Sequence, residues 1–230
     1  MSRELMQQNI QKAQLEIDAK KDIVKNGKMR QHYHFMAQTG WINDPNGLIY
    51  YKGKYHFFFQ YNPYYGFWDC MHWGHAVSED MVHWEYLPLA LAPSENYDNH
   101  PRGGCFSGSA IEHDGKLFLM FTGTANNGEG FEQTQCIAYS EDGIHFEKYE
   151  GNPVLTAPEG IPTDFFRDPK VWKHIIWYAE QAEIIKRRLF CIALKICSIG
   201  NSLMCLQRVA ANGAICGSVR ISIHLVINMS

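Results

Sequence analysis

The run Trp-Ile-Asn-Asp-Pro-Asn-Gly at 41–47 contains the acidic residue best placed to do chemistry, Asp44. Pro45 fixes its own φ and pushes Asp44 out of the α region, so we expect the carboxylate to project from an extended or turn backbone. Asn46 and Gly47 are typical of a turn before the apolar run that follows them. Taken alone, the pattern fits a surface turn better than a catalytic site, and its meaning depends on the rest of the chain.

A second place for chemistry is the pair Arg167-Asp168, which stands directly before Pro169. A guanidinium beside a carboxylate can keep it charged and position a polar ligand. The same pair serves equally well as a structural ion pair on a turn, so both interpretations stay open at this point.

Two histidines, His72 and His75, could suggest a metal site. Residues at i and i+3 of a strand point to opposite faces of a sheet, and no cysteine or third histidine is suitably spaced to complete a zinc site. We therefore expect neither a metal ion nor another cofactor.

The composition is that of a globular protein: of 230 residues, 46% are hydrophobic, 20% charged and 13% aromatic. The net charge of −3 gives no reason to expect nucleic acid or an anionic membrane as a partner. We find no signal-peptide pattern and no run apolar enough to span a bilayer, and seven cysteines without regular spacing indicate a reducing compartment. We expect a cytoplasmic protein, and the sequence leaves its oligomeric state open.

The chain begins with a helical pattern and continues with strands. Apolar residues are spaced among charges from Ser2 to Val24, which predicts a helix that packs against the body of the protein, a partner-binding helix being the alternative. From about 32 to 177 the segments are short, aromatic or β-branched and are separated by Gly-containing turns, as at 55–61 and 116–122. The sequence therefore predicts an all-β region.

This region repeats after about sixty residues. Ser-Glu-Asp-Met-Val-His-Trp-Glu at 78–85 recurs as Ser-Glu-Asp-Gly-Ile-His-Phe-Glu at 140–147, and each copy leads to a proline-bearing loop, at Pro88 and at Pro153. Four short strands per repeat at this period are typical of β-propeller blades. The match in register argues against two unrelated hairpins.

Five motifs in order carry a resemblance to a known family. They are the run at 41–47, Phe-Phe-Gln-Tyr-Asn-Pro at 58–63, Met-His-Trp-Gly-His at 71–75, Phe-Ser-Gly-Ser-Ala at 106–110 and Phe-Arg-Asp-Pro at 166–169. Together they resemble the catalytic propeller of glycoside hydrolase family 32, which holds invertases, sucrose-6-phosphate hydrolases and fructan hydrolases. Within the family, the chain looks most similar to the cytosolic sucrose-6-phosphate hydrolases.

The resemblance implies an all-β fold, a five-bladed β-propeller with a funnel-shaped site on its axis, of which this chain holds the first blades. We divide the chain into an N-terminal helix at 1–28, a partial catalytic propeller at 29–174 and a tail without family resemblance at 175–230. The implied reaction is retaining hydrolysis of a β-fructofuranoside such as sucrose or sucrose 6-phosphate, which needs two carboxyl groups about 5–5.5 Å apart.

The resemblance also implies roles for individual residues. Asp44 would attack the anomeric carbon of fructose, and Asp168 would bind fructose hydroxyls and stabilise the transition state. The amides of Asn43 and Gln60 can pair with adjacent sugar hydroxyls, and tryptophan faces can pack on a sugar ring. The expected substrate-binding residues are Trp41, Asn43, Gln60, Trp68, Phe106, Ser107 and Arg167.

The tail departs from the family and from the rest of the chain. All nine prolines lie at or before Pro169, and no aspartate follows Asp168. If the third base of each codon is joined to the first two of the next, the run 211–222 can encode Glu-Trp-Gly-Tyr-Met-Trp-Glu-Cys-Pro-Asp-Phe, the family's acid/base motif. In the same frame, 196–207 can encode Leu-Leu-His-Trp-Glu-Phe-Phe-Asn-Val-Phe-Ala, a third copy of the blade repeat. We therefore hypothesise a frameshift between about 168 and 178.

Several alternatives remain open from the sequence. The tail could be a diverged native C-terminus. The family activity could be that of a fructan hydrolase or fructosyltransferase, or the chain could be a carbohydrate-binding remnant or a non-functional fragment. No residue of the tail can be assigned as general acid, a group that typically contributes about 10²–10⁴ in rate, so we expect this polypeptide to be inactive as written.

The frameshift hypothesis predicts the DNA sequence. Reading the gene across codons 165 to 180 should show one inserted or deleted base relative to a frame that continues the family motifs. A clean read with an uninterrupted native frame in that window would contradict the hypothesis.

Overall fold

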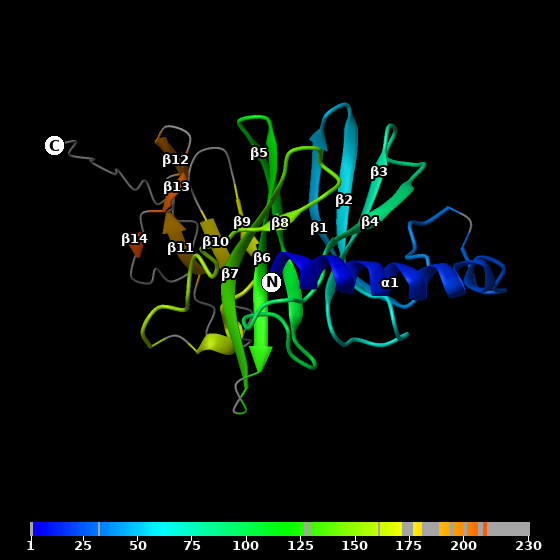
Figure 1. Ribbon diagram of the computed structural model, residues 1–230, viewed down its shortest axis with the longest axis horizontal. Coiled ribbons are helices and arrows are strands. Elements are labelled where there is room, and N and C mark those ends of the chain that lie inside the picture. The colour runs from blue at the N-terminus through cyan, green and yellow to red at the C-terminus, as the bar shows by residue number, and fades with distance from the viewer. Residues whose placement is uncertain are drawn as a thin grey trace.

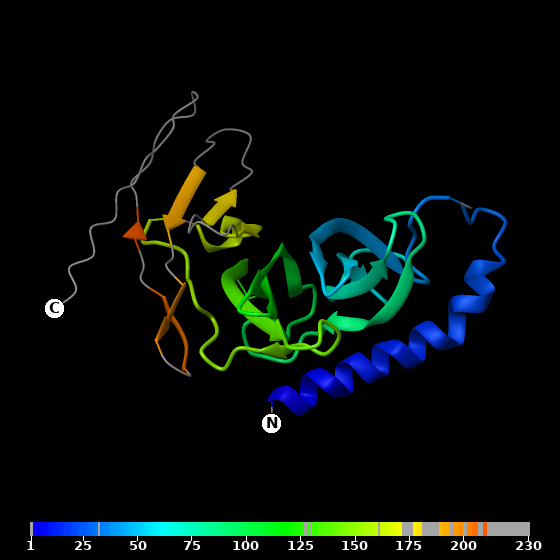
Figure 2. The same ribbon diagram turned by 90° about the horizontal axis from the view of Figure 1, so that it is seen from above.

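The computed structural model describes residues 2–31, 33–126, 128, 130–160 and 162–171, together with the backbone of five later strands. One helix, α1 (Ser2–Lys25), precedes two four-stranded antiparallel sheets and a smaller group of strands (Figures 1 and 2). The first sheet has the order β1-β2-β3-β4, and the second has the order β5-β6-β7-β8. The bounds are β1 Trp41–Tyr51, β2 Lys54–Asn62, β3 His72–Ser78, β4 Glu85–Leu91, β5 Gly104–His113, β6 Lys116–Asn126, β7 Phe131–Ser140 and β8 Glu147–Lys148.

A third sheet has the order β14-β11-β10-β9, and β12 and β13 form a separate pair. A short 3-10 helix, Thr163–Phe165, comes before β9. The reading-frame match at 196–207 falls on β12 and β13, described by their backbone alone, and the match at 211–222 lies outside the described residues. The bounds are β9 Pro169–Lys170, β10 Trp177–Glu180, β11 Leu189–Ala193, β12 Ile196–Ile199, β13 Ser202–Leu206 and β14 Val209–Ala210.

The prediction of a mostly β fold after one helix is confirmed, and two consecutive four-stranded sheets match the expected blades. The number of five blades stays a prediction. One detail is wrong: Pro88 lies inside β4 and not in a loop. A proline is tolerated in an outermost strand because its missing N–H need not face a partner strand.

The repeated Ser-Glu-Asp segments have the same structure in both blades. Each forms the turn between the third and fourth strands of its sheet. Asp80 accepts hydrogen bonds of 2.8 Å from the backbone N–H groups of Val82 and His83. Asp142 accepts equivalent hydrogen bonds from those of Ile144 and His145. In each copy the aspartate also pairs with a histidine Nδ1 at 2.7 Å. The repeat is therefore structural, a turn closed by its own side chain.

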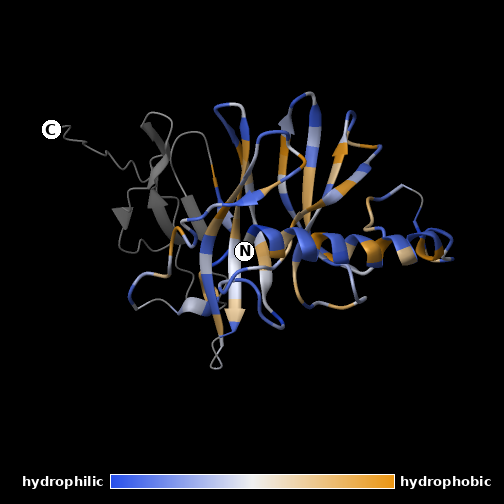
Figure 3. Ribbon diagram, in the orientation of Figure 1, coloured by the Kyte–Doolittle hydropathy of each residue, from blue (hydrophilic) through white to orange (hydrophobic). Residues whose placement is uncertain are grey.

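Helix α1 runs along the first blade, and its N-terminal end reaches β8 of the second blade (Figures 1 and 2). Its buried face consists of Met6, Ala13 and Ile17, which pack against the core, while Leu15 is 67% exposed. Orange, apolar stretches lie within the strands and along parts of the helix (Figure 3). The predicted packing of the helix against the body is confirmed. No described helix is long and apolar enough to cross a bilayer.

The first two blades meet along a shared core and several hydrogen bonds. The Tyr51 hydroxyl donates to the carbonyl of Gly115 at 2.7 Å, and Met71 bridges to Gly104. A buried cluster that includes Phe58, Trp73, Phe121 and Phe146 draws side chains from both sheets. The two blades are thus one packed unit, and their inner strands cannot shift independently.

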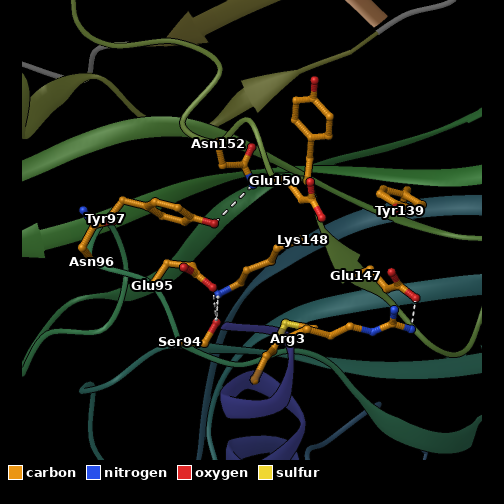
Figure 4. Close-up of a pocket in the computed structure, with 12 residues that line it drawn as sticks. Arg3, Ser94, Glu95, Asn96, Tyr97, Tyr139, Glu147, Lys148, Glu150 and Asn152 are labelled. Atoms are coloured by element: carbon orange, nitrogen blue, oxygen red, sulfur yellow. Dashed lines mark hydrogen bonds and ion pairs between the residues drawn. The ribbon is translucent and has the colours of Figure 1, made fainter. Parts of the chain in front are cut away.

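A buried ion pair fixes the connection between these blades. The Nζ atom of Lys148 lies 2.5 Å from Asp98 and also donates to Ser94 and to the carbonyl of Ala92. Burial lowers the pKa of Lys148, but the adjacent Asp98 carboxylate outweighs it and leaves the pKa above its ordinary value. Lys148 lines a pocket with a volume of about 190 Å³. Arg3 of α1 lines the same pocket and pairs with Glu147 (Figure 4).

Removing one partner of this pair should destabilise the protein strongly. Lys148→Met leaves the Asp98 carboxylate buried without its counter-ion, which should lower the free energy of unfolding by about 3–5 kcal/mol. Urea unfolding followed by circular dichroism measures this. The control is Lys116→Met, because Lys116 makes an exposed pair with Glu141 that should matter far less. Equal losses in the two variants would contradict the prediction.

Three buried histidines make stability depend on pH. Burial lowers the pKa of His72 to about 4, and burial also lowers the pKa of His56 and of His75. In the unfolded chain these groups titrate near their ordinary pKa of about 6.5. The unfolded state therefore binds more protons between these values, so stability falls as the pH drops from about 6.5 toward about 4.

His72→Gln tests this dependence. The slope of unfolding free energy against pH in that window should decrease by about 1.4 kcal/mol per pH unit, the contribution of one proton. Chemical denaturation at several pH values gives the slope. His34→Gln, which changes an exposed ring, should leave it unaltered. An unchanged slope in His72→Gln would show that His72 does not titrate on unfolding.

Candidate active site

Asp44 lies at an irregularity of the first strand. Ile42 pairs with Tyr61 and Pro45 pairs with Phe59, so Asn43 and Asp44 both stand opposite one residue of β2. A bulge of this kind re-aims side chains out of the regular alternation. The Asp44 side chain is exposed. Its backbone lies within β1, in agreement with the extended conformation expected from Pro45.

The predicted turn at Asn46 and Gly47 is wrong, because strand β1 continues through both residues. A second irregularity follows Asn46, and Gly47 has a left-handed φ of 51° there. A Cβ atom on Gly47 would lie 3.0 Å from the Cβ of Ala110 in the next blade. The glycine therefore serves a close approach of two strands and not a hairpin.

Ser107 lies at a matching irregularity of β5. Phe106 pairs with Thr122 and Gly108 pairs with Phe121, which leaves Ser107 as the extra residue. Its hydroxyl donates a hydrogen bond of 2.7 Å to Oδ2 of Asp44. Two bulges on neighbouring inner strands thus bring a carboxylate and a hydroxyl together from positions 63 residues apart.

Asp168 lies just before β9 with a left-handed φ of 61°, a conformation that costs free energy in a residue other than glycine. Its backbone N–H donates to the Thr122 hydroxyl at 3.0 Å. The Arg167 Nε atom lies 3.4 Å from Asp168 Oδ2, so the pair predicted at these positions is present.

Asp44 and Ser107 come from the first strands of their sheets, and Asp168 directly precedes β9. Strands β1, β5 and β9 each stand at one edge of their sheet, and β5 contacts both β1 and β9. The described site therefore gathers Asp44, Ser107 and Asp168 along the innermost strands, with the sheets spreading outward as seen from above (Figure 2). An exposed carboxylate that is held by a hydroxyl suits nucleophilic chemistry on a polar substrate.

Three of the predicted sugar-binding side chains make hydrogen bonds within the protein. The Asn43 Oδ1 atom accepts a hydrogen bond of 2.9 Å from Trp41 Nε1. Gln60 is only 2% exposed, and its Nε2 donates to the carbonyl of Cys105 at 2.9 Å. Gln60 thus links two blades, and one end of its amide is committed to this contact.

The aromatic residues near the site form a cluster. The rings of Trp68 and Phe106 meet edge to face with centroids 5.7 Å apart, and Phe131 contacts both of them. Phe131 was not predicted as a site residue, because it lies outside the five motifs and reaches the cluster through the β6–β7 hairpin.

The two histidines considered for a metal have other partners. His75 Nε2 lies 3.0 Å from His56 Nδ1, and His72 Nδ1 lies 2.7 Å from the carbonyl of Cys70. Within the described residues, no group of three or more His, Cys, Asp or Glu side chains could hold a metal ion. The pocket in Figure 4 contains none of the predicted site residues.

Sequence reasoning missed Thr122 and Gln135, which lie behind the site. Both are buried in the middle strands of the second blade, and they pair with each other in register. The Gln135 amide donates to the carbonyl of Phe166 at 2.7 Å. Only the strand pairing reveals them, because a buried threonine or glutamine in a strand carries no signal of its own.

Comparison with known proteins places this geometry in a family. The model for the glycosyl hydrolases family 32 N-terminal domain matches residues 34–186. The match extends beyond residue 174, where we expect the partial propeller to end. That domain boundary stays a prediction.

Several characterised relatives share this region. A sucrose-6-phosphate hydrolase of Escherichia coli is 49% identical over 147 residues, covering 62% of this chain and 29% of the relative. One from Bacillus subtilis is 44% identical over 165 residues, covering 71% and 33%. The chain thus spans about a third of the length of these relatives.

Solved structures agree. A Bombyx mori β-fructofuranosidase in complex with sucrose superposes with a TM-score of 0.70 at 40% identity, covering 79% of this chain and 38% of that one. A sucrose-6-phosphate hydrolase from Lactobacillus gasseri gives a TM-score of 0.70 at 30% identity, covering 85% and 39%.

Proposed function

The chain belongs to glycoside hydrolase family 32, and we propose that it is the N-terminal part of a retaining β-fructofuranosidase that cleaves sucrose or sucrose 6-phosphate. The observation that carries the proposal is the exposed Asp44 carboxylate, held by the Ser107 hydroxyl on the innermost strands. The named activities of the relatives support the same substrate class.

In this mechanism Asp44 attacks the anomeric carbon of the fructosyl group and forms a covalent intermediate, while the glycosidic bond breaks. The hydrogen bond from Ser107 orients the carboxylate for attack. The departing sugar takes a proton from a general acid, which we assign to the glutamate of the shifted reading frame. Water then releases fructose, with that glutamate acting as base.

Asp168 and Arg167 act on the sugar and not on the leaving group. We assign the Asp168 carboxylate to the fructose hydroxyls, where it stabilises the positive charge that develops on the ring. Arg167 lies beside it and fixes its orientation. Of the remaining substrate contacts, we assign Trp41, Asn43 and Gln60 to the fructosyl side.

We assign the aromatic cluster to the apolar contacts of the sugar site. Trp68 and Phe106 pack edge to face, an arrangement that presents ring surface to a sugar.

We place the protein in the cytoplasm, because its described cysteines, Cys70, Cys105 and Cys136, are free thiols and suit a reducing compartment.

A restored reading frame tests the reaction. The frame-restored protein should hydrolyse sucrose or its 6-phosphate, and Asp44→Asn should lower kcat by at least about 10³-fold, the scale expected when a nucleophile is lost. Product analysis on sucrose, sucrose 6-phosphate and inulin measures this and separates hydrolase from fructan hydrolase or fructosyltransferase. Asp114→Asn, on the exposed β5–β6 turn, is the control with unchanged activity.

The 230-residue chain itself should show no hydrolysis above background. Calorimetric titration with fructose decides whether it still binds sugar, and the absence of heat would dismiss a carbohydrate-binding role. Activity that survives Asp44→Asn in the frame-restored protein would overturn the assignment of the nucleophile.

A further inference from the structure

Thr122 lies where two parts of the site meet. Its hydroxyl accepts a hydrogen bond of 3.0 Å from the backbone N–H of Asp168. Its own hydrogen faces the carbonyl oxygen of Ser107 at 3.2 Å and Oε1 of Gln135 at 3.3 Å. Because the Ser107 side chain in turn donates to Asp44, a short chain of hydrogen bonds runs from Asp44 through Ser107 and Thr122 to Asp168.

The local geometry explains why Ser107 and Asp168 need such support. The bulge at Ser107 takes its carbonyl out of the regular ladder, so this oxygen is available to a side chain. Asp168 has a left-handed backbone, which persists in a residue other than glycine only when neighbours hold it. The Thr122 hydroxyl is the neighbour that satisfies the Asp168 N–H.

The surroundings make this contact well defined. Thr122 is fully buried, and Gln135 is 1% exposed. Gln135 also donates to the carbonyl of Phe166, so two middle strands of the second blade hold the segment that leads into β9. A hydrogen bond in such a buried position is not replaced by water when its partner is removed.

We propose that Thr122 is a positioning residue for the acidic pair, whose hydroxyl fixes Asp168 in place relative to Asp44. The importance of that placement for sugar binding rests on the roles proposed above for the two aspartates. Thr122 touches no substrate in this scheme, and it acts through Asp168 and Ser107.

The chain offers a closely matched control two residues away. Thr124 lies on the same strand, is equally buried, and its hydroxyl has no hydrogen-bond partner among the described residues. Thr122→Val and Thr124→Val therefore make the same chemical change in the same sheet, but only the first removes a bond to Asp168. Thr122→Ser keeps the hydroxyl and serves as the rescue variant.

The deciding measurement is amide hydrogen exchange at Asp168 in the 230-residue chain, followed residue by residue by NMR. Exchange should become about tenfold faster in Thr122→Val, the effect of losing one hydrogen bond, and should stay near the wild-type rate in Thr124→Val and Thr122→Ser. An Asp168 amide that exchanges within twofold of wild type in Thr122→Val would overturn the proposal. So would equal acceleration in Thr124→Val, since that indicates general loosening.

Fructose titration of the same variants separates this inference from the proposed function. If wild type binds fructose, Thr122→Val should weaken the affinity about tenfold and Thr124→Val should not; unchanged affinity in Thr122→Val would overturn the role in the site. If wild type shows no binding, the sugar site of the chain fails, while the exchange rates still decide whether Thr122 holds Asp168.

Discussion

The hydrogen bond from Ser107 to Asp44 depends on how the blades meet. Neighbouring blades contact along their first strands, and a regular strand in that position would point its side chains alternately toward its two faces. The irregularities at Asp44 and at Ser107 break this alternation, so both side chains reach the same place. The two strands also approach closely at Gly47, where a Cβ atom would touch Ala110, so this arrangement requires a glycine there.

Asp44 and Asp168 are exposed, so the positions of their side chains depend on contacts among the buried residues beneath them. The blades share an apolar core, but apolar packing alone does not set the direction of a polar group. Buried polar contacts do so here. Gln60 joins the first blade to the carbonyl of Cys105, and Lys148 joins the connection between the blades to the second sheet. Each has a fixed partner, because a buried polar group without one costs free energy.

The sequence predicted the parts of this structure that depend on local pattern. The helix at the N-terminus follows from apolar spacing, and the paired turns at Asp80 and Asp142 follow from a repeat that can be read directly. The position of Asp44 on an extended backbone follows from Pro45. The sequence could not show that Asn46 and Gly47 continue a strand, because the residue that requires the glycine, Ala110, lies in another blade.

The same limit explains which site residues sequence reasoning found. Asp44, Ser107 and Asp168 belong to recognisable motifs, whereas Thr122 and Gln135 are ordinary strand residues whose partners are fixed only by register. A one-residue change of register would turn both side chains to the other face of the sheet and remove the support of Asp168. Because the backbone of Asp168 is strained, that support has to come from outside its own segment. The placement of Asp44 and Asp168 thus depends on strand pairing in the second blade as much as on the motifs that contain the two residues.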